Sequence, residues 1–259
     1  MTAPVPVPAV SWLVCSHLAD ELLRLALQSC LTQTFSDFEL VFVANGPDAD
    51  EVAAQVVAWF AHDGRLRIVT TEVRHLTFSL SLGLHLAQGE LVARMDSDDI
   101  AAPHRLQLQT DFMAAHLEVS VLGTAYEWID ECGRSGRQVR PPLDDAAIRR
   151  ALLMGNPLCH PSVMLRRRAV LDVGGYLGSV YAQDYDLWAR LAADPATRFA
   201  NLPDVCLGYR RVSVGDARGA RSAYAAMAAA QFRNLAGGAG VRWGAAALLS
   251  WFKANWRSR

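Results

Sequence analysis

Three carboxylates crowd into four positions near the end of "LVARMDSDDI", which covers residues 91–100. They are Asp96, Asp98 and Asp99, and they follow a run of apolar residues. In an extended chain alternate side chains share a face, so Asp96 and Asp98 point to similar sides. Carboxylates this close resist joint ionisation unless a cation neutralises them. The spacing indicates a site for a hard divalent ion bound together with phosphate oxygens, whereas the alternative is a solvated acidic turn in which Asp99 caps the following helix.

Short apolar runs alternate with segments of helical periodicity in the first hundred residues, and they position this cluster. The predicted strands are residues 10–15, 38–44, 66–70 and 91–95. The predicted helices between them are residues 19–33, 48–62 and 78–88. Unbroken apolar strands need cover on both sides, so this order predicts an α/β fold with a Rossmann-like, mostly parallel sheet and helices on both faces. Ligands bind beyond the carboxyl ends of such strands, where the acidic cluster should lie.

From about residue 118 the pattern becomes mixed. We expect a helix beginning at Pro103, then the following elements: a strand at 119–129, a polar turn at 130–136, a short returning strand at 137–142, helices at 144–153 and 184–193, and a strand at 204–210. After Asp216 no acidic residue occurs, whereas seven Lys or Arg residues do. The sequence therefore predicts one catalytic domain over residues 1–216, with halves at 1–100 and 101–216, and a basic helical appendage at 217–259.

Overall composition excludes several classes of protein. Lys and Arg number 25 against 26 Asp and Glu, a formal charge of -1, so no global field attracts nucleic acid. The five cysteines are scattered without metal or redox spacing, which fits reduced thiols. The segment "MTAPVPVPAV" is expected to be an extended lead-in and not a signal peptide, because three prolines interrupt it. No apolar run is long enough for a spanning helix. We expect a cytoplasmic protein that is soluble or lies on the inner face of the plasma membrane.

Three blocks of sequence resemble family 2 glycosyltransferases. The segment "ARMDSDDIAAPHRLQLQ" resembles the family's acidic motif, and "LADELLRLALQSCLTQTFSDFELVFVANG" is similar to its N-terminal nucleotide-binding unit. The third block, "GNPLCHPSVMLRRRAVLDVGGY" followed by "YAQDYDLWARLA", resembles the acceptor side. The resemblance implies a glycosyltransferase-A fold and inverting transfer of a sugar from a nucleotide-diphosphate sugar, with a UDP-sugar favoured. It also implies a carbohydrate or lipid-linked acceptor in bacterial surface polysaccharide or glycoconjugate synthesis.

The resemblance assigns roles to the carboxylates. Asp98 matches the direct ligand of Mn²⁺ or Mg²⁺, and Asp96 matches the residue that reaches the ribose or a metal-bound water. The cation would neutralise the diphosphate as the sugar C1–O bond breaks. Asp184 in "QDYDLW" matches the catalytic base, which takes the proton of the acceptor hydroxyl. The alternative is that Asp184 only caps its helix and Asp186 is an exposed charge.

Two acceptor-side residues have competing interpretations. Trp188 is expected in the core, as aromatic residues on helices usually are, with stacking against a sugar as its alternative. His160 in "CHPS" matches a recurrent His-Pro of the family. It either contacts donor or acceptor, or is a satisfied structural histidine.

The nucleoside end departs from the family pattern. Ala44 and Asn45 stand where acidic residues are common, and Asn45 can still donate to and accept from a base. Ser81 stands where an Asn is common. Arg74 and His75 are candidates for contact with the base or phosphates, with ordinary surface charge as the alternative.

Val212 stands where many relatives carry a histidine that completes the metal site. This departure predicts looser metal binding, completion of the site by water, or a flexible tail that closes over the donor. Arg210 or Arg211 would then stabilise the diphosphate, since guanidinium groups pair well with phosphate oxygens. The processive signature Q-x-x-R-W is absent, so we expect transfer of a single sugar. The departures at Ala44, Ser81 and Val212 motivate a second hypothesis, a non-catalytic binding module of the same fold. A third is an Asp-dependent phosphotransferase, although its acidic motif should follow an early strand.

The segment 243–259, "WGAAALLSWFKANWRSR", holds three of the seven tryptophans among basic residues. One interpretation is a helix that lies on an anionic bilayer carrying a lipid-linked acceptor. The other is an amphipathic helix packed on its own domain or on a neighbouring chain, which would make the protein a homo-oligomer.

Overall fold

The computed structural model describes residues 7–177, 180–211 and 217–256. The strands are β1 (Val10–Ser16), β2 (Phe38–Asn45), β3 (Leu66–Thr71), β4 (Leu91–Met95), β5 (Ile100–Ala101), β6 (Val119–Ile129), β7 (Ser135–Val139), β8 (Met164–Arg166) and β9 (Arg198–Arg210). Within the described ranges they form one nine-stranded sheet in the order β3-β2-β1-β4-β8-β6-β9-β5, with β7 beside β6. The lead-in at residues 1–6 lies outside the described residues.

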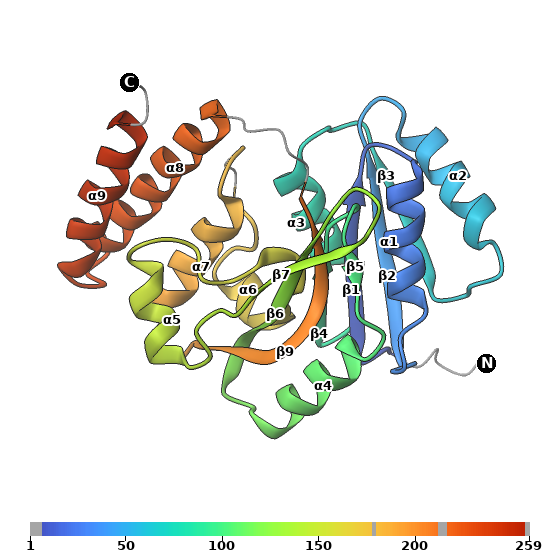
Figure 1. The fold of residues 1–259 in the computed structure, drawn as a ribbon, viewed down its shortest axis with the longest axis horizontal. Helices are drawn as coiled ribbons and strands as arrows, with labels where there is room; N and C mark the ends of the chain where they lie inside the picture. The colour runs from blue at the N-terminus through green and yellow to red at the C-terminus, as the bar shows by residue number, and fades with distance from the viewer. Residues whose placement is uncertain (1–6, 178–179, 212–216, 257–259) are drawn as a thin grey trace.

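Helices surround this sheet (Figure 1). They are α1 (Glu21–Leu31), α2 (Ala49–Phe60), α3 (Leu76–Leu86), α4 (Arg105–Ala115), α5 (Asp145–Leu152), α6 (Arg167–Asp172), α7 (Gln183–Ala193), α8 (Ala217–Ala236) and α9 (Arg242–Trp256), with a 3₁₀ turn at His160–Ser162. The predicted α/β architecture is confirmed. The described helices contain none long and apolar enough to cross a bilayer.

The first half is a parallel βαβ arrangement, as predicted. β1 lies between β2 and β4, with Val10 opposite both Phe38 and Leu91, and β2 pairs with β3. Since all four strands run the same way, their carboxyl ends meet at one edge. Helix α1 begins after Asp20, whose side chain accepts a hydrogen bond from the Leu23 backbone N–H at 2.9 Å and caps the helix.

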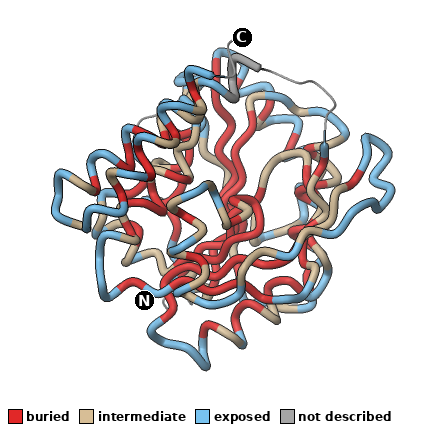
Figure 2. The backbone as a smooth tube through the Cα atoms, turned by 60° about the vertical axis from the view of Figure 1, so that its left-hand side comes forward, coloured by how far each residue is buried: buried red, intermediate tan, exposed pale blue. Residues whose placement is uncertain are grey.

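Alternation along β1 divides the core into two layers. Trp12 and Val14 point into a cluster with α1, α2 and α4, whereas Leu13 and Cys15 point into a cluster with α3, α5, α7, α8 and α9. Both clusters lie deep in the molecule, where Figure 2 shows the backbone as buried. Helix α3 comes close to the sheet because Gly83 lacks a side chain: a Cβ there would lie 2.2 Å from a methyl carbon of Leu13.

The second half is mixed, as predicted, but several boundaries differ. β8 runs antiparallel to β4 and β6, whereas β6 and β9 are parallel. β9 begins at Arg198, six residues before the predicted start, and β7 begins at Ser135 inside the predicted turn. The short elements β5, β8 and α6 were not predicted, because segments of two to six residues carry too little periodicity. Helix α4 begins at Arg105, after Pro103.

Helices α8 and α9 form a hairpin at one end of the molecule (Figure 1). The turn between them contains Gly238 and Gly240 with φ of +82° and +111°, a conformation that favours glycine. Gly244 allows close packing, since a Cβ there would lie 2.9 Å from a methyl carbon of Leu235. Trp243 is buried in the same apolar cluster as α7, so the appendage packs on the second half of the chain.

Candidate active site

The acidic cluster lies where the sequence predicted it, at the carboxyl edge of the parallel strands. β4 ends at Met95, beside Val14 of β1, and Asp96 follows at once. The chain then enters β5, whose Ile100 pairs with Gly208 of β9. The three carboxylates therefore occupy the short connection between β4, a parallel strand of the first half, and β5, which pairs with the last strand of the second half.

Each carboxylate has a different environment. Asp96 forms an ion pair with Arg94, and its side chain is 33% exposed. Burial, and then the neighbouring charge of Asp96, raises the pKa of Asp98. Asp99 is only 1% exposed, and burial followed by the charge of Asp96 raises its pKa to about 8. One oxygen of Asp99 accepts the Arg210 backbone N–H at 2.7 Å, so this side chain ties β5 to β9.

The alternative role of Asp99 as a helix cap is wrong. The N-cap position of α4 is His104, which makes no side-chain capping bond. Asp99 is instead turned inward, and its second oxygen is buried with no hydrogen-bond partner among the described residues. Asp96 and Asp98, the pair expected from their alternate spacing, are therefore the two carboxylates that remain partly exposed.

Arg94 is a buried cation beneath the cluster that the sequence analysis missed. Its side chain is 2% exposed and pairs with Asp96, while its Nε has no hydrogen-bond partner in the described part of the chain. The charge of Arg94 also lowers the pKa of His160 and acts on Asp184 and Asp98. One basic residue inside the apolar run "LVARM" was the available signal, because a charge is rarely buried without a partner.

Arg210 has a role that differs from the predicted contact with the donor diphosphate. It is 5% exposed; its Nε donates to the Asp98 carbonyl at 2.7 Å, and Nη1 donates to the carbonyls of Asp130 and Glu131 at 2.6 and 2.8 Å. These bonds link the segment that contains Asp98 to the residues that follow β6. Arg211 lies exposed with its guanidinium 4.0 Å from the ring centre of Trp128. Its contact with phosphate stays a prediction, and Val212 lies outside the described residues.

Asp184 lies in the first turn of α7, half-buried, and its Oδ2 accepts a hydrogen bond from Asn156 Nδ2 at 2.6 Å. Burial raises its pKa, although bonds from Tyr185 N–H and Asn156 and the charge of Arg94 oppose that shift. The capping alternative is wrong, because Ala182 occupies the N-cap position with a φ of +55°. A backbone in this region costs energy for a non-glycine residue and is common beside functional sites.

Asp186, the second carboxylate of "QDYDLW", is structural and not an exposed charge. Its side chain is 13% exposed and bridges Arg190 at 2.9 Å and Arg233 at 2.8 Å. Arg190 also donates to the Val173 and Gly175 carbonyls. The network joins α7 to α8 and to the loop after α6, so it fixes the helix that carries Asp184.

His160 and Trp188 lie behind the site. Trp188 is 0% exposed, so its alternative role as a platform for the acceptor sugar is wrong and its expected place in the core is confirmed. The Nε2 of His160 lies 2.9 Å from the Tyr176 hydroxyl, and its ring is edge-on to Trp188. Burial, and then the charge of Arg94, holds the pKa of His160 well below its usual range, which favours the neutral ring. These contacts favour the structural interpretation of His160.

The predicted nucleoside residues gather at the ends of β1 and β2. Asn45 closes β2 and is buried, and Gly46 follows with a φ of +106° that places it against the stem of Arg74. Burial, and then the charge of Arg74, lowers the pKa of His17, which follows β1. His75 is the N-cap residue of α3 without a side-chain cap. His17 was missed because a lone histidine after a strand carries no motif.

Ser81 was predicted to bind the donor with these nucleoside residues, but the structure gives it a different contact. Its hydroxyl donates to the Tyr176 carbonyl at 2.8 Å and so links α3 to the second half.

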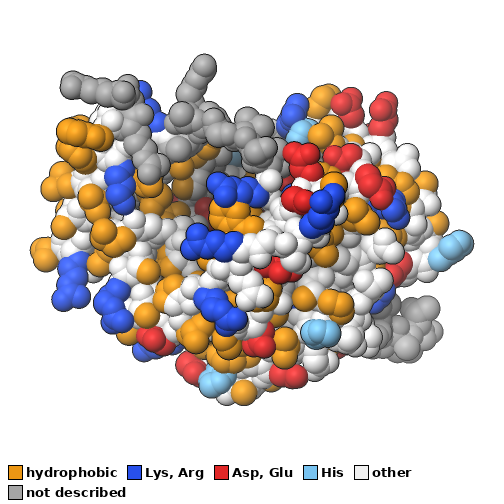
Figure 3. Space-filling view, in the orientation of Figure 1, with side chains coloured by type: hydrophobic (Ala, Val, Ile, Leu, Met, Phe, Trp, Pro, Cys, Tyr) orange, Lys and Arg blue, Asp and Glu red, His pale blue; other side chains and the backbone are white. Residues whose placement is uncertain are grey.

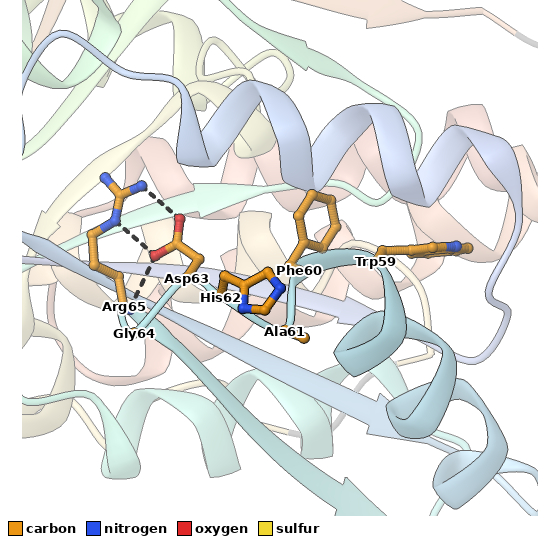
Figure 4. A pocket seen from close by; sticks show the side chains of 7 residues that line it. All are labelled: Trp59, Phe60, Ala61, His62, Asp63, Gly64 and Arg65. Carbon is orange, nitrogen blue, oxygen red and sulfur yellow. Dashed lines mark hydrogen bonds and ion pairs between the residues drawn. The ribbon is translucent and has the colours of Figure 1, made fainter.

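A separate pocket lies at the far edge of the sheet, around the residues that connect α2 to β3 (Figure 4). Asp63 and Arg65 in that pocket pair with each other at 2.6 Å. It lies at the amino end of β3, away from the acidic edge.

A divalent ion fits the acidic edge only with additional ligands. The described residues include no group of three or more His, Cys, Asp or Glu side chains that could hold a metal. Asp98 and Asp96 nevertheless supply hard oxygens, and a cation would stabilise the ionised form of Asp98, whose pKa is raised by burial and then by the charge of Asp96. Phosphate oxygens and water would complete the coordination, as is usual for Mg²⁺.

Comparison with solved structures defines the class of fold. The chain superposes on S. aureus TarS 1–349 in complex with UDP-GlcNAc with a TM-score of 0.67 and 18% identity, over 86% of this chain and 66% of that one. It superposes on the mannosyltransferase PcManGT from Pyrobaculum calidifontis, solved with GDP-Man and Mn²⁺, with a TM-score of 0.70 and 17% identity, over 98% and 73%. The fold is the glycosyltransferase-A fold, as predicted.

Sequence comparison identifies the family. The model for "Glycosyl transferase family 2" matches residues 11–175. The O-antigen biosynthesis glycosyltransferase WbnJ of Escherichia coli is 34% identical over 78% of this chain and 79% of its own length. The amylovoran biosynthesis glycosyltransferase AmsE of Erwinia amylovora is 36% identical over 73% and 71%. The chain belongs to glycosyl transferase family 2 and is a glycosyltransferase.

Proposed function

We propose that the protein transfers one sugar, with inversion and with the help of Mn²⁺ or Mg²⁺, from a nucleotide-diphosphate sugar to a hydroxyl of a carbohydrate or lipid-linked glycan. The relatives named for O-antigen and amylovoran biosynthesis support a role in bacterial surface polysaccharide synthesis. The structural neighbours that hold UDP-GlcNAc and GDP-Man support a nucleotide-sugar donor, and we favour a UDP-sugar. The five cysteines are free thiols, which supports a cytoplasmic location.

The observation that carries the proposal is the arrangement of charges around Arg94. This buried cation pairs with Asp96 and also acts on Asp98 and Asp184, which lie on opposite halves of the chain. The proposed metal-binding pair and the half-buried carboxylate proposed as the base are thus both influenced by the charge of Arg94. Displacement at a sugar carbon needs these two functions: stabilisation of the leaving diphosphate and removal of a proton from the attacking hydroxyl.

On the donor side, Asp98 and Asp96 would hold the ion, which supplies Lewis-acid stabilisation of the diphosphate when bound. Asn45 and Arg74 lie where the nucleoside would enter, beside the ends of β1 and β2. Arg211 adds an exposed guanidinium near the end of β9. In the proposal these side chains bind and orient the donor, while Arg210 holds the connection that carries Asp98.

The metal assignment is tested by calorimetry with nucleotides in the presence and absence of Mn²⁺. Asp98→Asn and Asp98→Ala should abolish Mn²⁺-dependent nucleotide binding as well as transfer. Asp37→Asn, which changes an exposed carboxylate in the loop before β2, should leave both unchanged. Full nucleotide binding and activity in the Asp98 variants would refute the metal assignment.

On the acceptor side, Asp184 would accept the proton of the attacking hydroxyl. Asp184→Asn should preserve donor binding and lower kcat by about 10² to 10⁴, the usual contribution of a general base. Donor binding measured by calorimetry is the internal control for folding. A normal rate of transfer would exclude Asp184 as the base.

A donor-hydrolysis screen across nucleotide sugars tests the whole proposal. Release of nucleotide from one donor identifies the sugar and the base together. Metal-dependent binding of a nucleotide without turnover of any donor would favour the binding-module hypothesis. A trapped aspartyl-phosphate at the acidic motif would instead favour the phosphotransferase.

A further inference from the structure

Helix α9 has two apolar faces. One packs against α8 and the body of the protein through Trp243, Ala246, Ala247, Ser250 and Ala254. The other is exposed and consists of Leu248 (70%), Trp251 (59%), Phe252 (50%) and Trp256 (71%). These four residues recur at helical spacing, so they share one stripe. We call them the aromatic face.

Two of the three aromatic rings on the aromatic face pack against each other. The rings of Phe252 and Trp256 stack with their centres 5.0 Å apart and their planes at 27°. Four large aromatic or aliphatic side chains left in water on a single helix are unusual for a soluble surface, and such patches commonly mark an interaction site. We therefore expect the aromatic face to bind a partner, and the charged residues around it indicate what kind of partner.

The hairpin of α8 and α9 is much more basic than the rest of the chain. Residues after Asp216 include seven Lys or Arg and no Asp or Glu, although the whole chain has a formal charge of -1. Arg221 and Arg242 are exposed on α8 and α9. Figure 3 shows hydrophobic and basic side chains together over the end of the molecule where these helices lie. An occupant of this face should therefore be apolar and negatively charged.

We propose that the aromatic face of α9 binds an anionic lipid surface, with the helix lying in the plane of the headgroups. Trp rings prefer this depth, because their apolar bodies face the acyl chains while their N–H groups stay near water. Nearby Lys and Arg side chains add attraction to lipid phosphates. A second copy of the chain would instead bring two strongly basic hairpins together, which opposes association.

The described part of α9 is shorter than the hydrocarbon core of a bilayer. α9 has 15 residues, which corresponds to about 22 Å at 1.5 Å per residue. A bilayer has a hydrocarbon core of about 30 Å. A helix that is too short to cross but carries aromatic residues on one side and basic residues beside it is typical of interfacial binding.

Membrane binding is separate from the transfer reaction and does not depend on it. Membrane binding would bring the enzyme to acceptors that are carried by lipid. The test below uses neither donor nor acceptor, so its failure would leave the proposed activity untouched.

The experiment is co-sedimentation of the full chain with vesicles. Phosphatidylcholine vesicles with about one-third phosphatidylglycerol should bind the protein, and added salt should weaken binding. Pure phosphatidylcholine should bind far less. Transfer of Trp251 and Trp256 to the interface should also shift tryptophan fluorescence to shorter wavelength.

Matched variants separate the apolar and electrostatic contributions. The combined change Trp251→Ser, Phe252→Ser and Trp256→Ser should lower the partition coefficient about a hundredfold or more, because three rings no longer leave water. Arg221→Gln and Arg242→Gln should each lower it roughly fivefold. The control Leu117→Ser removes a 75% exposed apolar side chain from the loop after α4 and should change nothing.

Three results would overturn the proposal. The unaltered protein could fail to bind anionic vesicles, or the triple serine variant could bind them as well as the unaltered protein does. The third result is a dimer in light scattering that the triple variant converts to a monomer, with no vesicle binding, which would make a second copy the occupant. Urea unfolding of the triple variant checks that it is folded.

Discussion

The hydrogen bond from Asn156 to Asp184 should set the pH dependence of the reaction. Asn156 Nδ2 donates to the Asp184 carboxylate at 2.6 Å and stabilises its ionised form. Burial acts the other way and raises the pKa of Asp184. The Asn156→Ala variant lacks this hydrogen bond, which lowers the pKa of Asp184. Burial should therefore raise the pKa of Asp184 further in the variant. A base works when deprotonated, hence the rise of kcat with pH should move to higher pH.

The size of the shift follows from the strength of the bond. A hydrogen bond to a charged group contributes about 1.5–3 kcal/mol when shielded from water. One pKa unit corresponds to about 1.4 kcal/mol, so a shielded bond would move the pKa by about one to two units. Asn156 is an exposed residue, and water can replace its amide in the variant. We therefore expect a shift of about half a unit to one unit, with the rate at high pH little changed.

The assay is nucleotide release at saturating donor and acceptor across the pH range from about 5 to 9. Gln107→Ala is the matched control, because Gln107 also donates its amide to a carboxylate, that of Asp111 at 2.9 Å, on the exposed side of α4. An acid limb that stays in place in Asn156→Ala would refute the assignment of Asp184 as the titrating base. So would an equal shift in the Gln107 variant.

Three further changes test the supports of the site by urea unfolding. Arg94→Met should lower the free energy of unfolding by about 2 kcal/mol, between the costs of breaking an exposed and a buried pair, and a double-mutant cycle with Asp96→Asn should show coupling. Asp99→Asn should be nearly neutral in acid, because an amide oxygen still accepts the β9 N–H, and increasingly stabilising as the pH rises toward about 8. Burial raises the pKa of Asp99 to about 8, so over this range ionisation of the carboxyl favours the unfolded chain, and only above it is a buried charge present. Gly83→Ala should cost about 1–3 kcal/mol through overpacking against β1, whereas Gly64→Ala, where a Cβ meets nothing within 4 Å, should cost far less.

The first half of the fold could be predicted from the sequence because its signals are local. Apolar runs such as 38–44 and 91–95 are each interrupted by only one charged residue, Glu39 or Arg94, and the helices between the strands have clear periodicity. The position of Asp96 and Asp98 directly after the predicted strand 91–95 likewise placed them at the carboxyl edge. Short elements such as β8 escaped, since they exist only through pairing with strands that lie far away in the sequence.

The supports of the site could not be predicted for a related reason. Arg94, Asn156 and Tyr176 act through partners that no local pattern reveals, and Asn156 reaches a residue 28 positions away. Arg210 was correctly placed near the acidic motif, but its burial decided that it bonds to backbone carbonyls. A sequence shows which groups are able to bind phosphate. Only the fold shows which of them are still accessible to do so.

The bonds of Arg210 also have a consequence for the order of folding. This one side chain joins the carbonyl of Asp98, 112 positions earlier, to those of Asp130 and Glu131. Closing so long a loop loses conformational entropy, and this loss precedes the stabilisation that the contact provides. The parallel strands can therefore assemble while the segment around Asp98 is still unformed. During refolding, secondary structure should recover first, and the capacity to bind nucleotide should return only when the last strand arrives.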